Sequence, residues 1–124
     1  MILLLLWLLI AKHFVADFVL QSDFQVEQKG TYGAVGGIEH AIIHGIMTTL
    51  ILCCFVEYPA SALLLGALDS LVHYHIDYVK ARFGTRDPNT KRFWTELGFD
   101  QFCHYTFYLW LAWVLHPVVA EATI

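Results

Sequence analysis

Histidine and aspartate recur at three- or four-residue steps inside otherwise apolar stretches of this sequence. The first such stretch, "KHFVADFVLQSD", places His13, Asp17 and Gln21 four residues apart. Because an α-helix completes a turn every 3.6 residues, this spacing predicts that the three side chains share one helix face. Imidazole and carboxylate groups bind divalent transition metals and transfer protons in enzymes. The later stretches supply His40 and His44, then Asp69, His73, Asp77 and Lys80, and finally Asp100, Gln101 and His104.

The composition indicates which elements must position these residues. The chain has 124 residues, of which 58% are hydrophobic and only 15% are charged, whereas soluble domains carry about 25% charged residues. Four apolar runs, at roughly 2–24, 37–57, 60–82 and 97–119, are each long enough to cross a hydrocarbon core of ~30 Å. A soluble helical bundle is disfavoured because few residues remain to form a polar outer face. We therefore predict an all-α, polytopic membrane protein in which residues 1–124 form a single four-transmembrane-helix bundle.

The links between these runs predict the orientation of the chain in the membrane. The segment "FQVEQKGTYGAVGG" indicates a loop, and the longer third link carries a turn signal at Asp87-Pro88-Asn89. The positive-inside rule places the loops around residues 25–36 and 83–96 in the cytoplasm and both termini in the periplasm. A net charge of −4 without a long basic run argues against nucleic acid as a partner. The basic residues on the predicted cytoplasmic side are Lys29, Lys80, Arg82, Arg86, Lys91 and Arg92.

With this topology, the polar residues of all four runs fall in the cytoplasmic half of the bilayer. An ionisable group at the bilayer centre costs at least ~2.5–3.5 kcal/mol, so we expect these side chains to turn inward and cluster. A single polar residue in such a helix more often only joins two helices. We expect Gln21, His40, Asp69 and Gln101 to orient the metal ligands by hydrogen bonds. The expected ligands themselves are His13, Asp17, His44, His73, Asp77, Asp100 and His104.

Several motifs resemble those of a known family. The stretches "HFVADFVLQSD", "HYHIDYVK" and "GFDQFCH", with a histidine in the second run between them, are similar to the small bacterial and phage membrane proteins of domain-of-unknown-function family 3307. The resemblance covers nearly the whole chain and implies a location in the bacterial inner membrane, but it transfers no activity. The positions that match the family motifs are His13, Asp17, Gln21, His73, Asp77, Lys80, Asp100, Gln101 and His104.

The residue types indicate a metal-dependent reaction. Neutral imidazoles and carboxylates bind zinc, our preferred metal, and the number of donors allows one or two ions. We expect a hydrolase that acts on an amphiphilic or phosphoester substrate, with Asp17 or Asp100 as general base and Lys80 stabilising negative charge. The nucleophile-elbow, zincin and phosphate-loop motifs are absent from the sequence.

Two other functions stay open from the sequence. The cluster could belong to a proton or divalent-ion transport unit, or it could be structural in a non-catalytic phage or host membrane-interaction protein. The predicted outer half of the membrane domain is almost entirely apolar, which favours a blind pocket over a conducting path. The lipid bilayer is the expected partner, and a homo-oligomer is compatible with the sequence.

Overall fold

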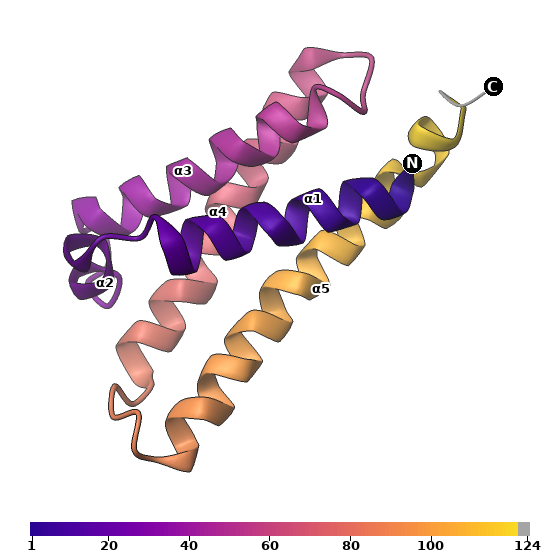
Figure 1. The fold of residues 1–124 in the computed structure, drawn as a ribbon. Helices are drawn as coiled ribbons and strands as arrows, with labels where there is room; N and C mark the ends of the chain where they lie inside the picture. Colours follow the sequence, from indigo (N-terminus) through magenta and orange to yellow (C-terminus); the bar gives the residue numbers. More distant parts are fainter. Residues whose placement is uncertain (122–124) are drawn as a thin grey trace.

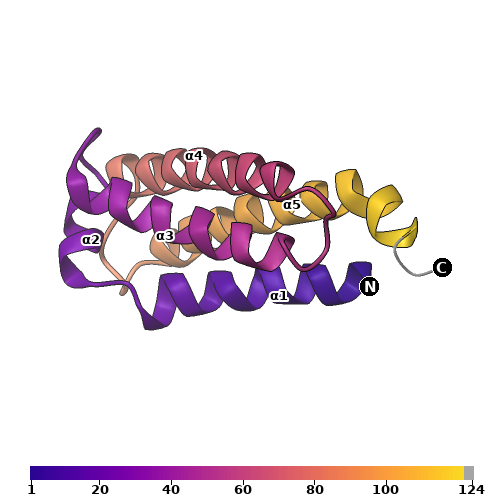
Figure 2. The ribbon, with the colours of Figure 1, turned by 90° about the horizontal axis from the view of Figure 1, so that it is seen from above.

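The computed structural model describes the backbone of residues 1–121 and the side chains of residues 1–117. Within the described residues, the secondary structure is entirely helical. Four long helices pack into one bundle, and a short helix lies at one end of it (Figure 1). The N-terminus and the last turns of the final helix lie together at the opposite end (Figure 2). The elements are α1 (Ile2–Phe14), a π-helical turn η1 (Val15–Val19), α2 (Asp23–Gln28), α3 (Val35–Leu52), α4 (Pro59–Phe83) and α5 (Lys91–Glu121).

The first helix ends in a π-helical turn, which changes the expected position of one polar residue. The amide of Leu20 donates to the carbonyl of Val15 at 2.9 Å, a five-residue step that closes η1. Such single π turns are frequent at functional sites because they rotate the side chains that follow. The helix then stops before Gln21, so the prediction of one helix face shared with His13 and Asp17 is wrong for Gln21.

The first link contains a helix where the sequence indicated a loop. Ser22 accepts a hydrogen bond from the amide of Gln25 at 3.3 Å, and the Gln25 side chain accepts one from the amide of Ser22 at 3.2 Å. This reciprocal pair is a capping box, which satisfies two backbone donors that have no partner within the helix. The capping box therefore starts α2, and the expected loop at 25–36 is helical in its first part.

The link between α4 and α5 is shorter than predicted. It covers residues 84–90 rather than 83–96, because α5 begins at Lys91. The predicted turn is confirmed: Asp87 Oδ1 accepts the backbone amide of Asn89 at 3.0 Å, and the Asp87 carbonyl accepts the amide of Thr90 at 3.2 Å. The earlier start makes α5 31 residues long and brings its basic first turn next to the end of α4.

Two stretches of helix, Ile2–Val19 and Val35–Leu52, are long and apolar enough to cross a membrane. At the end of the bundle that holds the N-terminus, the helices meet in an apolar core. Close approach of α3 and α4 is permitted by glycine: a Cβ atom at Gly45 would overlap the hydroxyl of Ser70 and lie 2.6 Å from the carbonyl oxygen of Gly66. The apolar core consists of Leu5, Leu9, Leu52, Phe55, Ala62, Tyr108, Leu111 and Leu115.

Candidate metal centre

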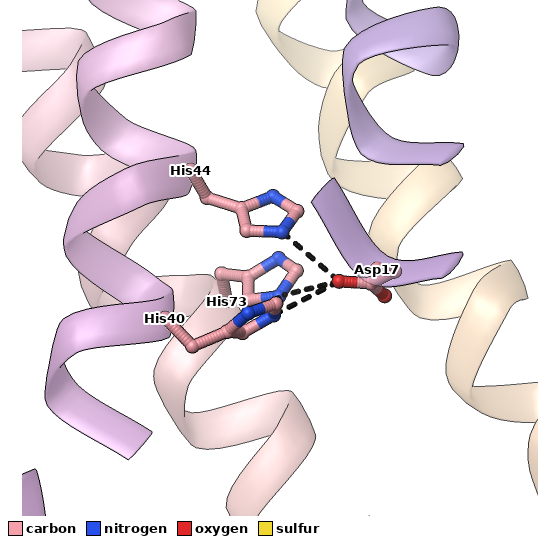
Figure 3. A group of neighbouring side chains, drawn as sticks. All are labelled: Asp17, His40, His44 and His73. Atoms are coloured by element: carbon pink, nitrogen blue, oxygen red, sulfur yellow. Dashed lines mark hydrogen bonds and ion pairs between the residues drawn. The ribbon is translucent and has the colours of Figure 1, made fainter. Parts of the chain in front are cut away.

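Asp17 lies at the centre of a group of histidines from two other helices (Figure 3). The π turn η1 carries Asp17 towards α3 and α4, where its Oδ1 lies 2.9 Å from Nε2 of His40 and 2.9 Å from Nε2 of His44. The Nε2 atom of His73 lies 3.4 Å from the same oxygen and 3.2 Å from Nε2 of His40. Three imidazoles therefore present the same ring nitrogen to one carboxylate oxygen.

A second group of donors adjoins the first through His73. Asp77 Oδ2 lies 3.2 Å from Nε2 of His73, and Asp77 Oδ1 lies 3.3 Å from Nε2 of His104. Lys29, the first residue after α2, forms an ion pair with Asp77: its Nζ lies 2.6 Å from Asp77 Oδ2. The donor atoms form three overlapping groups, each compact enough to surround a metal ion, and His73 belongs to all three. The groups are Asp17, His40, His44 and His73; His13, His73 and His104; and Asp17, His73, Asp77 and His104.

The separations of the donors around His73 fit metal coordination. Zinc–nitrogen bonds of 2.0–2.1 Å in a tetrahedral site place neighbouring ligand atoms about 3.3 Å apart. The distances around His73 Nε2, from 3.2 to 3.4 Å, match this value. In addition, Asp100 Oδ1 is buried without a hydrogen-bond partner among the described residues, which is unusual for a polar atom unless a ligand satisfies it.

His13 orients the cluster through hydrogen bonds. Gln101 donates its Nε2–H to Asp100 Oδ2 at 3.1 Å, which turns its Oε1 towards His13 Nε2 at 3.0 Å. An amide oxygen only accepts, so His13 Nε2 carries the proton and its Nδ1 accepts from the hydroxyl of Tyr108 at 3.2 Å. Gln101 therefore links His13 to Asp100, and the protonated Nε2 makes His13 better suited to hydrogen bonding than to binding a metal.

The sequence prediction overlooked Lys12, which is one of the least exposed residues of the bundle. Its Nζ pairs with Asp69 Oδ2 at 2.7 Å, and Thr48 donates to the same oxygen at 2.6 Å. The ammonium group also lies 4.8 Å from the centre of the Tyr108 ring, a cation–π distance. A signal was present in the sequence, because a lysine in the middle of an apolar run must find an acidic partner. Asp69 is that partner, so it supports the cluster through Lys12 rather than by touching a ligand.

Lys12 also determines the role of His44. The Lys12 Nζ lies 3.2 Å from Nδ1 of His44, and an ammonium group can only donate. The Nδ1 atom of neutral His44 must then accept, so its proton sits on Nε2 and is donated to Asp17. In this arrangement His44 holds the carboxylate, and His40, which we expected to orient a ligand, directs Nε2 to within 3.2 Å of Nε2 of His73.

A polar cavity of about 290 Å³ opens beside the cluster at the end of the bundle that holds α2. Asp17, Asp77 and Asp100 reach its wall, so it leads to the candidate ligands. The structure places Gln21 and Lys80 on this wall rather than in contact with the clustered donors. The remaining polar residues of the wall are Lys29, Thr85, Arg86 and Gln101.

The comparison with known proteins agrees with the sequence motifs. The model of the family described as "Protein of unknown function (DUF3307)" matches residues 4–123. The chain belongs to this family. The predicted family membership is thus confirmed, and the DUF3307 match includes every residue of the cluster. No curated protein and no solved structure matches the chain. The function of this DUF3307 protein must therefore be argued from the geometry of its own site.

Proposed function

We propose that this DUF3307 protein spans the bacterial inner membrane four times, through α1 with η1, α3, α4 and α5. The outward faces of these helices support insertion, since exposed leucine, isoleucine, phenylalanine and tryptophan side chains cover the bundle far beyond what a soluble monomer shows. The 25 residues of α4 and 31 of α5 exceed the length needed to cross a bilayer. Basic residues in the two links and at the adjoining ends of α4 and α5 favour a cytoplasmic location for the links and a periplasmic location for both termini.

We further propose that the protein is a metal-dependent hydrolase of an amphiphilic or phosphoester substrate. The observation that carries this proposal is the convergence of imidazole nitrogens and carboxylates on His73 Nε2 at the spacing of metal ligands. A bound zinc ion would supply an activated water for hydrolysis. The adjoining polar cavity offers space for the reacting part of a substrate.

The residues of the cavity suit separate roles in such a reaction. Asp17 is engaged by several imidazoles, which fits a ligand better than a general base. Asp100 lines the cavity with an Oδ1 atom that has no hydrogen-bond partner among the described residues, so it is the better candidate for accepting a proton. Lys80 lies on the same wall and can stabilise negative charge that develops on the substrate.

The layers of the bundle favour a hydrolase over a transport unit. From the cytoplasmic end inward, the polar cavity leads to the clustered donors, and these lead to the Lys12–Asp69 pair. Beyond this pair, the apolar core of leucine, phenylalanine and alanine side chains fills the space between the helices. A conducting path needs polar groups or water through both halves of the membrane. The blocked outer half instead supports a site that opens on one side.

The metal prediction can be tested on the intact protein purified in mild detergent. We expect at least one equivalent of a divalent transition metal, zinc by preference, measured by elemental analysis. Replacing His73 by alanine should remove the metal because this residue belongs to every donor group. His75→Ala is the matched control: it lies on the same helix, is exposed, and directs Nδ1 to the carbonyl of Leu71 at 2.7 Å.

Two outcomes would contradict the proposal. One is metal far below one equivalent in protein that was never exposed to chelator. The other is equal metal content in the His73→Ala and His75→Ala variants, because adventitious surface binding would not distinguish these positions. A bound metal should also raise the unfolding temperature, since its ligands come from different helices; at a free concentration of 100 times Kd the stabilisation is about 2.7 kcal/mol.

A further inference from the structure

A second cavity lies between α4 and α5, the two helices joined by the link at residues 84–90. It encloses about 770 Å³, a volume within the range of about 300–1,000 Å³ typical of sites for small organic ligands. Apolar side chains dominate its wall, among them Ile76, Val79, Phe83 and Phe99. Val79, Phe83 and Phe99 are also exposed on the outside of the bundle. We call this cavity the α4–α5 groove; in a membrane it would open sideways to the lipid.

The α4–α5 groove adjoins the polar cavity, and two residues line both. Lys80 from α4 and Asp100 from α5 line both spaces. Asp100 Oδ1 lies 3.8 Å from Nε2 of His104, so the shared wall reaches the candidate metal centre. A molecule that occupies both spaces would have an apolar part between α4 and α5 and a polar part next to the donors.

The charges around this junction favour an anionic polar part. Lys29 is paired with Asp77 at 2.6 Å, and Arg92 donates to Glu96 Oε1 at 2.6 Å. Lys80, by contrast, has no ion-pair partner within 4.0 Å among the described residues. Its ammonium group lines both spaces together with the Asp100 carboxyl and can donate hydrogen bonds to a phosphate group where the two cavities meet.

We propose that the α4–α5 groove holds an acyl chain of a phosphate-bearing membrane lipid, with the phosphate at Lys80 and facing the candidate metal centre. This assignment rests on the proposed hydrolase function, because the bound lipid would be the substrate. The substrate class is then an anionic phospholipid that enters from the cytoplasmic leaflet between α4 and α5. A free phosphate would fill the polar cavity and leave the apolar groove unused. A neutral lipid would fill the groove and leave the Lys80 ammonium group without a phosphate partner.

Photo-crosslinking in lipid nanodiscs tests the proposal directly. The protein is reconstituted in phosphatidylcholine with a small fraction of phosphatidic acid that carries a diazirine in one acyl chain, and the labelled peptides are mapped by mass spectrometry. Label should concentrate on groove residues such as Phe99 and Cys103. Unlabelled phosphatidic acid should compete for this labelling. A diacylglycerol probe with the same diazirine should label the groove about tenfold less, the factor that corresponds to one charge-assisted hydrogen bond.

Variants separate the headgroup contact from the chain contact. Lys80→Gln should reduce labelling by phosphatidic acid to the level of diacylglycerol, and Lys80→Arg should restore it. Cys103→Trp should fill the groove and reduce labelling by both probes. Thr106→Trp is the matched control, since Thr106 lies on α5, is exposed and is not part of the groove wall.

The outcomes distinguish this inference from the proposed function when metal content is measured in the same samples. Label spread evenly over the lipid-facing helices, or equal labelling by both probes, overturns the lipid site even if metal is bound. A third outcome also overturns the lipid site: inorganic phosphate binds to the protein, but the phosphatidic acid probe does not label the groove. Groove labelling in protein that lacks metal supports the lipid site and contradicts the metal-dependent hydrolase instead.

Discussion

The buried pair between Lys12 and Asp69 makes a quantitative prediction about stability. The perturbation is Lys12→Met, which keeps the length of the side chain and removes its charge. Lys12 is 4% exposed and Asp69 only 1% exposed, and their charged atoms are 2.7 Å apart. At this distance and an effective dielectric constant of about 20, the attraction is about 6 kcal/mol. The desolvation of both groups offsets most of it.

The single and double variants should therefore behave differently. Lys12→Met leaves the Asp69 carboxylate buried with the hydroxyl of Thr48 as its one remaining donor among the described residues, and we expect the free energy of unfolding to fall by about 3–5 kcal/mol. In Lys12→Met/Asp69→Leu no charge is left uncompensated, so stability should return to within about 1 kcal/mol of the wild type or exceed it. Lys91→Met is the control, because Lys91 is exposed at the start of α5 and should change stability by less than about 0.5 kcal/mol.

The assay is reversible unfolding in mixed detergent micelles, followed by circular dichroism and by tryptophan fluorescence. Coincident transitions from the two probes are needed before free energies are compared. The reasoning is refuted if Lys12→Met costs less than about 1 kcal/mol, the value of an ordinary polar contact between membrane helices. It is also refuted if the double variant is no more stable than the single one, because the loss would then come from packing rather than from an uncompensated charge.

Two further predictions concern the close helix contact and the carboxylate at the centre of the cluster. Gly45→Ala should destabilise the bundle by about 1–3 kcal/mol because its Cβ would overlap α4. Gly98→Ala is the control, since it has open space around it and should be neutral or stabilising. Equal changes in unfolding temperature for the two variants would disprove the close contact between α3 and α4. Asp17→Asn should weaken zinc binding at least about tenfold in a chelator-competition titration. Asp23→Asn is the control, because Asp23 is exposed on α2 and its replacement should leave zinc affinity unchanged. Unaltered zinc affinity in Asp17→Asn would show that Asp17 is not part of the metal site.

Helix identity and the polar face of each helix could be predicted from the sequence because they depend on local spacing. The four-residue steps of His40 to His44 and of His73 to Asp77 place each pair on one face of any α-helix, whatever packs against it. The apolar runs around these pairs leave burial against other helices as the only favourable place for their polar groups. This reasoning predicted an all-helical chain and the clustering of His40, His44, His73 and Asp77, without any knowledge of which atoms touch.

The contacts within the cluster were decided by tertiary packing. The π turn at Asp17 depends on how α1 ends against α3, and no local pattern specifies the extra residue in that turn. Lys12 could be assigned to Asp69 only after α1 and α4 were brought together, since the two residues are 57 positions apart. In this position Lys12 donates to Nδ1 of His44, so Nε2 of His44 carries the proton and donates to Asp17. Local spacing determines the face of a helix on which a side chain lies, whereas the partner of each polar atom depends on the rotation and depth of the neighbouring helices, which only the packed bundle defines.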